Sequence, residues 1–220
     1  YPNMEKFFHG TKTLFLGNPI RKNIITDIID SDLAKEKLGL EKGKLTILSV
    51  GGSLGSRTLN NGWKENINQI LEKDYQLIWQ TGKPGATSYI KAAAEFPNVY
   101  VSSFIDDMSA AYTAADIVIS RSGAMAVAEI AVTGKVGVFV PYPFAAEDHQ
   151  TFNAMQLVNK GAALIVKDNE VNEQLITTIL KLLNDEVAVK TIQEKVKSFV
   201  LLNADHVIAE QIIAHIQNVK

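Results

Sequence analysis

The sequence contains no cysteine among its 220 residues. This absence excludes a disulfide-stapled scaffold, thiolate metal sites and a cysteine nucleophile, and it is typical of proteins kept in a reducing cytoplasm. A strong charge of either sign is also missing, since 22 basic and 24 acidic side chains give a formal net charge of −2. A chain so nearly balanced has no basic excess, so we expect no nucleic-acid partner.

Long apolar runs are absent as well, and we expect no leader segment. We expect no membrane span, because no apolar run approaches the ~18 residues that one needs, and no signal peptide at the start of this sequence. The first residue is Tyr1 rather than methionine, so we expect a fragment of a longer protein. With 46% hydrophobic and 21% charged residues, the composition is that of an ordinary globular protein with one ample domain or two small ones.

Short apolar runs alternate with helical patterns over most of the chain. Many of the runs are apolar throughout, which is typical of strands covered on both faces and therefore of a parallel sheet. The sequence predicts a doubly wound, Rossmann-like α/β domain. The predicted strands are 45–50, 75–80, 99–104, 117–119, 136–140 and 163–166, with one strand-like piece at 13–16. The predicted helices are 57–71, 89–95, 108–115, 126–133, 151–160, 171–185, 186–200 and 203–219.

The last predicted helix carries one apolar stripe, formed by Ile208, Ile212, Ile216 and Val219. Such spacing is typical of a helix face that packs against other parts of a protein.

The most informative stretch is residues 120–129, which read SRSGAMAVAE. It follows the strand predicted at 117–119 and leads into the helix predicted at 126–133. A strand, a tight loop of small residues and a helix start direct several backbone N–H groups and the positive end of a helix dipole toward one point. An anion such as a diphosphate is the ligand that this geometry favours.

Glu129 lies about a turn and a half into that helix, at ~1.5 Å rise per residue. A carboxylate repels phosphate, so a Glu129 that faces the ligand must bind another part of it. A vicinal diol such as a ribose donates two hydrogen bonds to such a group. Phosphate at the helix tip and a carboxylate beyond it together indicate a nucleotide. We expect Glu129 to lie at the helix surface, so that Glu129→Ala weakens nucleotide binding and leaves the fold intact.

Residues 51–56 (GGSLGS) follow the first long strand and open a helix, where open α/β sheets bind ligands. A dinucleotide fingerprint would need glycine where Val50 stands, and no acidic residue ends the second strand, so NAD binding is disfavoured. The Walker pattern is absent too. A glycine turn that only joins a strand to a helix explains the loop equally well, and the residues leave both interpretations open.

Residues 104–108 (FIDDM) follow another predicted strand. Helix capping is the better interpretation of the two aspartates, with Asp106 as a good N-cap, because their spacing does not fit a D-x-D metal motif. We therefore expect no metal here. The backbone of Ile105, at the tip of the strand, is placed to read the edge of a base.

Gln150 and Asn153 lie three residues apart on one face of the helix predicted at 151–160. Amide side chains suit sugar hydroxyls because they both donate and accept hydrogen bonds. A polar helix N-terminus explains the pair at least as well by spacing alone. His149 fits either a general base or a capping residue.

In their order along the chain, these segments resemble the carboxyl-terminal half of the MurG family of peptidoglycan N-acetylglucosaminyltransferases, within glycosyltransferase family 28. The matching pieces are GNPIR at 17–21, GGSLGSR at 51–57, FIDDM at 104–108, SRSGA at 120–124 and DHQTFNA at 148–154. The resemblance spans about residues 10–215. Leu54 and Val136 stand where the family often has Gln and Pro, and neither change removes a side chain expected at the ligand.

The resemblance implies the C-terminal, Rossmann-like domain of a two-domain GT-B glycosyltransferase, which binds UDP-GlcNAc without a cofactor or metal. By motif, Ile105 would contact uracil, Glu129 the ribose, and Gln150 and Asn153 the GlcNAc hydroxyls. The residues expected around the diphosphate are Arg21, Ser53, Ser122, Gly123, Ala124, Met125 and Ala126.

The same resemblance places the catalytic base and the acceptor surface in an N-terminal domain that this chain lacks. Residues 1–20 would be the trailing edge of that domain and the linker, residues 21–202 the donor domain, and residues 203–220 a crossover helix that returns to the missing domain. The implied reaction is inverting transfer of GlcNAc from UDP-GlcNAc to the muramyl 4-hydroxyl of lipid I, which forms lipid II. The family's enzymes act peripherally on the cytoplasmic face of the bacterial plasma membrane.

Two alternatives remain. One is an enzyme like UDP-GlcNAc 2-epimerase, which needs acid–base carboxylates near the sugar that the sequence does not convincingly offer. The other is a UDP-sugar-binding module without catalysis, which describes the expected behaviour of the isolated fragment.

Overall fold

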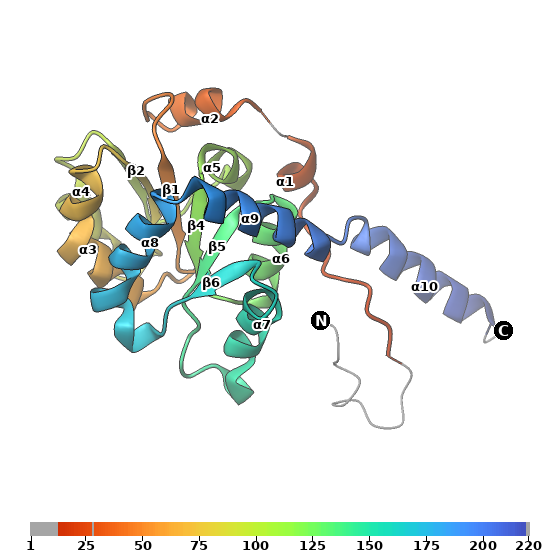
Figure 1. Ribbon diagram of the computed structural model, residues 1–220. Coiled ribbons are helices and arrows are strands. Elements are labelled where there is room, and N and C mark those ends of the chain that lie inside the picture. The colour runs from red at the N-terminus through yellow and green to blue at the C-terminus, as the bar shows by residue number, and fades with distance from the viewer. Residues whose placement is uncertain (1–12, 28, 219–220) are drawn as a thin grey trace.

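The computed structural model describes residues 13–27 and 29–218, and it is built around a six-stranded sheet (Figure 1). The strands are β1 (Thr46–Val50), β2 (Gln76–Gln80), β3 (Val99–Ser102), β4 (Ile117–Ser120), β5 (Val136–Phe139) and β6 (Ala163–Ile165). All neighbouring strands are parallel, in the order β3-β2-β1-β4-β5-β6. The predicted doubly wound sheet is therefore confirmed.

Helices cover both faces of the sheet (Figure 1). The α-helices are α1 (Lys22–Thr26), α2 (Ser31–Lys37), α3 (Arg57–Leu71), α4 (Ala86–Ala93), α5 (Met108–Ala114), α6 (Ala124–Val132), α7 (His149–Val158), α8 (Ile176–Leu183), α9 (Glu186–Val196) and α10 (Ala204–Asn218). Short turns of other helix types are η2 (Ala146–Asp148), η3 (Asp168–Glu170), η4 (Val171–Leu175) and η5 (Lys197–Phe199).

Two apolar clusters, one on each face, hold the helices to the sheet. Adjacent strand residues point to opposite faces, so Leu48 packs with α5, α6 and α7 while its neighbour Ile47 packs with α3 and α8. Residues 46–49, 76–80 and 117–120 are buried throughout. This is the burial that the unbroken apolar runs predicted, because both faces of the sheet are covered.

The structure corrects several details of the prediction. Residues 13–16 form no strand, because they have no neighbouring strand with which to pair. Helices α1 and α2 were not predicted, although Asp30 caps α2 by accepting from the backbone N–H groups of Asp32 and Leu33. Helix α4 begins three residues before the predicted start and α6 two residues before it. Asp107, not Asp106, caps α5 by accepting from the backbone N–H of Ala110.

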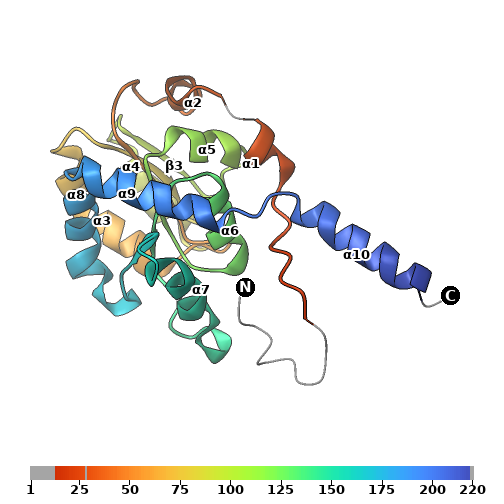
Figure 2. The same cartoon turned by 45° about the vertical axis from the view of Figure 1, so that its right-hand side comes forward.

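The last helix, α10, projects away from the body of the domain in two views 45° apart (Figures 1 and 2). Ile212 and Ile216 of the predicted stripe are both more than half exposed, and Val219 lies outside the described residues. Ile208 is partly buried, and neither of the two apolar clusters of the described residues includes the stripe. The domain boundaries at residues 20/21 and 202/203 stay a prediction.

One stretch, Glu186–Gln217, is long and apolar enough to cross a membrane by length and composition alone. This differs from the expectation that no run approaches a span, because an average over 18 residues tolerates two charged side chains that interrupt a run. The backbone is not one helix there, since residues 200–203 separate η5 from α10.

Candidate functional site

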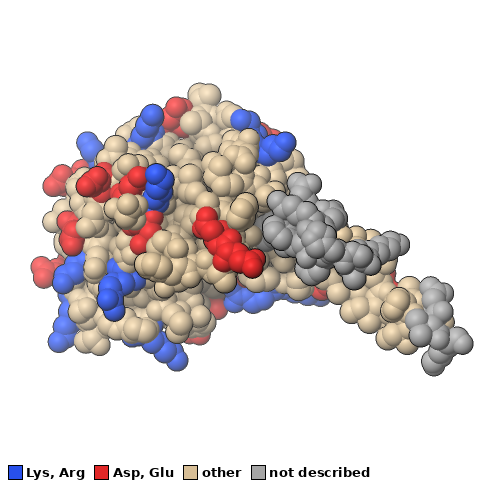
Figure 3. Space-filling view, turned by 90° about the horizontal axis from the view of Figure 1, so that it is seen from below, with Lys and Arg blue, Asp and Glu red and all other residues tan. Residues whose placement is uncertain are grey.

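A cavity of about 720 Å³ lies at the carboxyl ends of the strands. It sits where the chain order of the sheet reverses, between β1 and β4, which is the usual ligand position in open α/β sheets. The residues that line it are Arg21, Val50, Gly51, Gly52, Ser53, Leu54, Gly55, Ser56, Arg57, Thr58, Gln80, Phe104, Ile105, Met108, Ser120, Arg121, Gly123, Met125, Ala126, Glu129, Tyr142 and Gln150. Figure 3 views the molecule from this end and shows both acidic and basic side chains on the described part of this face.

Two helix N-termini contribute to the wall of the cavity. The first residues of α3, capped by the Ser56 hydroxyl, line it, as do Gly123 and the first turn of α6. Gly123 makes no side-chain cap for α6. Helix N-termini carry partial positive charge, and Arg21, Arg57 and Arg121 add three cations to the lining. This end of the cavity is suited to an anion.

Glu129 is the single Asp or Glu among the described residues that line the cavity. Its Oε1 accepts from Nε and Nη2 of Arg21, both at 3.3 Å, and its Oε2 accepts from the Tyr112 hydroxyl at 3.1 Å. Burial and the neighbouring carboxylate raise the pKa of Tyr112, so its hydroxyl stays protonated and donates. Glu129 is 8% exposed, so it is a buried group and not the helix-surface carboxylate that we expected.

The linker before α1 is tied to the same helix. Asn18 donates to the carbonyl of Ala124 at 3.4 Å, and three residues later Arg21 pairs with Glu129 in the next turn of α6. The segment 17–21 therefore lies alongside the first two turns of α6.

The sequence left open whether the glycine loop after β1 binds a ligand or only joins a strand to a helix. Gly55 has φ +76°, and a Cβ there would lie 1.9 Å from the carbonyl oxygen of Thr81, so the loop after β2 leaves room only for glycine. A Cβ on Gly51 would lie 2.3 Å from the Ser56 nitrogen. The glycines are thus required by close backbone approach, and the turn that they allow presents Ser53 to the cavity.

Ile105 lines the cavity, but its backbone N–H is already bound. Gln80, at the end of β2, accepts from that N–H at 3.0 Å and donates to the carbonyl of Gly52 at 3.2 Å. No hydrogen bond to the Ile105 carbonyl is found in residues 13–27 and 29–218, so this oxygen is the atom of Ile105 left for a ligand. Sequence reasoning missed Gln80, whose signal was a polar residue at the tip of a buried strand.

Gln150 and Asn153 contact the turn before α6. The Gln150 Oε1 accepts from the backbone N–H groups of Ser122 at 3.3 Å and Tyr142 at 3.0 Å. Asn153 donates to the Ser122 carbonyl at 3.0 Å, and the Ser122 hydroxyl donates to the Gln150 carbonyl at 2.8 Å. These bonds join α7 to the turn that precedes α6.

The start of α7 carries backbone strain next to these contacts. Glu147 and Asp148 both have positive φ, at +50° and +53°. Each costs roughly 1–2 kcal/mol for a residue with a Cβ, and such strain clusters at binding sites.

Arg121 clamps three loops beneath the cavity. Its guanidinium donates to the carbonyls of Val140 and Pro141 at 3.0 and 3.1 Å, and it forms an ion pair with Asp168. The Tyr142 ring covers it, with 5.5 Å between the guanidinium carbon and the ring centroid. Sequence reasoning missed this role of Arg121.

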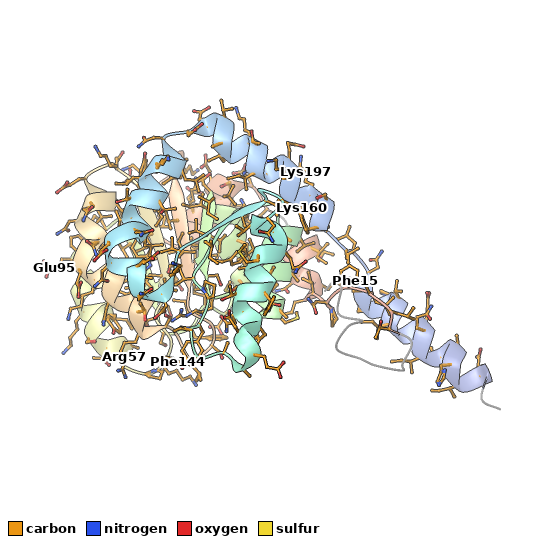
Figure 4. All side chains as sticks on the ribbon, turned by 60° about the horizontal axis from the view of Figure 1, so that its bottom comes forward. Phe15, Arg57, Glu95, Phe144, Lys160 and Lys197 are labelled. Atoms are coloured by element: carbon orange, nitrogen blue, oxygen red, sulfur yellow. The ribbon has the colours of Figure 1, made fainter. Side chains whose placement is uncertain are left out.

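The ion pair between Arg121 and Asp168 is largely buried: the two side chains are only 11% and 19% exposed. Asp168 also accepts from the Thr58 hydroxyl at 3.0 Å, so the clamp extends to the first turn of α3. Arg57 of that turn and Phe144 of the loop after β5 lie at the same end of the molecule (Figure 4).

Most of the predicted site residues meet in this one cavity. Arg21, Ser53, Ile105, Gly123, Met125, Ala126, Glu129 and Gln150 line it. Ser122, Ala124 and Asn153 are not among its lining in the described part of the chain; Ser122 and Asn153 are buried and hydrogen-bonded to each other. Among residues 13–27 and 29–218, no group of three or more His, Asp or Glu side chains is arranged to hold a metal ion.

Comparison with known proteins decides the family. Residues 46–212 match the model of the glycosyltransferase family 28 C-terminal domain. The chain belongs to this family. Its relatives include the UDP-N-acetylglucosamine–N-acetylmuramyl-(pentapeptide) pyrophosphoryl-undecaprenol N-acetylglucosamine transferase of Bacteroides thetaiotaomicron, which is 44% identical over 97% of the chain. The chain spans 58% of that relative's length.

Solved structures with the same fold include another member of this enzyme group. This family 28 domain matches Acinetobacter baumannii MurG with a TM-score of 0.71 and 30% identity, over 87% of this chain and 55% of that one. A protein described as a UDP-N-acetylglucosamine 2-epimerase from Listeria monocytogenes matches with a TM-score of 0.64 and 15% identity, over 84% of this chain and 47% of that one. The latter likeness concerns the fold alone.

Proposed function

We propose that this family 28 domain binds UDP-GlcNAc and forms the donor half of an inverting N-acetylglucosaminyltransferase. The observation that carries the proposal is the cavity between β1 and β4, whose lining includes two helix N-termini, three arginines and a single carboxylate, Glu129, which pairs with Arg21. Positive charge at one end suits a diphosphate, and a lone carboxylate suits a diol. The named activity of the Bacteroides relative supports the choice of sugar and reaction.

In this proposal the nucleotide lies across the carboxyl ends of the strands. The Ile105 carbonyl accepts the N3–H of uracil and Glu129 accepts the ribose hydroxyls. Ser53, Arg21 and residues 122–126 surround the diphosphate, where backbone N–H groups and the α6 dipole contribute. Gln150 binds GlcNAc hydroxyls, for which its side-chain oxygen must exchange one of its two backbone donors. Asn153, predicted beside it, does not line the cavity in the described part of the chain and holds the turn through the Ser122 carbonyl.

The proposed reaction transfers GlcNAc to the muramyl 4-hydroxyl of lipid I. That oxygen attacks the anomeric carbon, the bond from this carbon to the diphosphate breaks, UDP leaves with the electron pair, and the hydroxyl proton passes to a base. The helix N-termini and Arg21 stabilise the charge that develops on the leaving diphosphate. We propose that the base and the acceptor surface belong to the part of the relatives that this chain does not span, and that the whole enzyme works peripherally at the cytoplasmic face of the plasma membrane.

An epimerase-like activity is the less favoured alternative. Acid–base chemistry at a sugar carbon needs at least two proton-transferring groups near it. The described lining of the cavity offers one carboxylate, and Arg21 and Tyr112 already hold it.

The first test of the proposed function is nucleotide specificity. We expect UDP to bind about tenfold or more tightly than ADP and CDP, measured by titration calorimetry, because cytosine and adenine present no N–H where uracil has N3–H and would leave the Ile105 carbonyl unpaired at a cost of ~1–3 kcal/mol. UDP-GlcNAc serves as the positive control. Equal affinities for UDP, CDP and ADP would contradict the proposal.

The second test changes the charge of Glu129. Glu129→Gln keeps the side chain's size and an acceptor for Tyr112, and we expect it to weaken UDP binding by about 1.5–3 kcal/mol, the range for hydrogen bonds to a charged group. Glu129→Ala is expected to lower the melting temperature as well, because it leaves the buried Tyr112 hydroxyl without its acceptor. UDP affinity that is unchanged in Glu129→Gln would show that Glu129 is structural only.

A further inference from the structure

The carboxylate proposed to bind ribose is held from two sides that differ in rigidity. Arg21 approaches from the solvent side, with a half-exposed side chain on a linker that leads into a helix of only five residues. Tyr112 approaches from the core, on α5, and is 4% exposed. Its ring belongs to the apolar cluster that joins α5 and α6 to the sheet. Of the two partners, the tyrosine is the one with a fixed position.

The two partners also differ in what a nucleotide would do to them. Arg21 lines the cavity and is a proposed diphosphate ligand, so its contact with Glu129 is open to exchange when the donor binds. Tyr112 does not line the cavity in the described part of the chain, and no ligand there can replace its hydroxyl. A carboxylate has about four lone-pair positions, so the bond to Tyr112 on Oε2 still leaves acceptors for a diol.

We propose that Tyr112 is a positioning residue that fixes the Glu129 carboxylate for the 2′- and 3′-hydroxyls of the nucleotide ribose, and so makes the domain selective for ribonucleotides. This inference rests on the proposed function. Two hydroxyls of a ring are read together only if both carboxylate oxygens are held in one orientation, because a carboxylate that rotates about its last bond loses the paired geometry. Locked partner side chains are the general means of such preorganisation.

The same side chain could instead be an ordinary core residue that happens to reach a buried acceptor. A purely structural tyrosine would affect UDP and 2′-deoxy-UDP equally, since the two ligands differ only in one hydroxyl. A positioning tyrosine changes the ratio of the two dissociation constants. This ratio is therefore the decisive quantity.

The experiment titrates UDP and 2′-deoxy-UDP into the 220-residue chain and into Tyr112→Phe. We expect the unaltered chain to bind UDP about tenfold or more tightly than 2′-deoxy-UDP, the effect of one hydrogen bond to a charged group. In Tyr112→Phe the ratio should fall to about twofold, mainly through weaker UDP binding.

Tyr89→Phe is the matched control. It removes a tyrosine hydroxyl that donates to Asn61 at 2.8 Å outside the cavity lining, so the ratio should equal that of the unaltered chain. A second line of evidence combines Tyr112→Phe with Glu129→Gln. If the tyrosine acts through Glu129, adding Tyr112→Phe to Glu129→Gln should change the ratio little further.

The outcomes separate the two proposals. A chain that discriminates against 2′-deoxy-UDP equally well with and without the Tyr112 hydroxyl overturns the positioning role and leaves the donor site standing. A chain that binds UDP without any preference over 2′-deoxy-UDP overturns both the positioning role and the assignment of Glu129 to ribose. Absence of UDP binding by the unaltered chain overturns the proposed function itself.

Discussion

The 220-residue chain by itself is expected to bind UDP-GlcNAc and to transfer no measurable GlcNAc to lipid I. Holding the two reacting groups in attack geometry is worth ~7–11 kcal/mol of the barrier, or about 10⁵–10⁸-fold in rate. The chain spans 58% of the Bacteroides relative, and we propose that the other part of such an enzyme holds the acceptor. The measurement is formation of lipid II from lipid I and labelled UDP-GlcNAc.

Two further experiments control for other causes of inactivity. Calorimetry with UDP on the same preparation shows that the donor site is formed, so that inactivity is not the result of unfolding. Adding the remaining part of the relative in trans should restore some turnover, with docking through the exposed Ile212 and Ile216 face of α10. Robust lipid II synthesis by the chain alone would overturn the assignment of the acceptor site to another domain.

Arg121→Met is expected to destabilise the domain by about 3 kcal/mol, the lower end of the range for removing one partner of a buried ion pair. Asp168 is mostly buried and would be left with only the Thr58 hydroxyl as a partner. The Val140 and Pro141 carbonyls would also lose their donor. The measurement is the free energy of unfolding in urea, extrapolated to water.

Adding a second substitution, Asp168→Asn, tests whether the unpaired charge causes the loss of stability. Arg121→Met combined with Asp168→Asn should be more stable than Arg121→Met alone, because the unpaired buried charge is then gone. Lys190→Met is the control, since it breaks an exposed ion pair with Glu186, and its effect should be close to zero. If Arg121→Met unfolds at the same urea concentration as the unaltered chain, the clamp contributes nothing to stability.

The sequence by itself determined the class of the fold and the general place of the site. Unbroken apolar runs such as the one that became β4 have no polar face, and only a sheet covered on both sides buries them. The loops after β1 and β4 were recognised because glycine and other small residues between a strand and a helix have a local geometric meaning. Eight of the predicted site residues line one cavity, among them Ser53 of the first loop and Gly123 of the second.

The tertiary structure decided which atoms of those residues are available. Whether Glu129 lies at the surface or in the core depends on α5, which is adjacent to α6 only after the sheet has formed. The Ile105 N–H is occupied by Gln80 because β2 and β3 are neighbours in the sheet. Arg121 and Asp168 are 47 positions apart in the printed sequence and meet through the fold, so no local pattern predicts the clamp. Local spacing specifies helices, strands and turns, whereas hydrogen-bond partners distant in sequence are fixed only when the elements pack together.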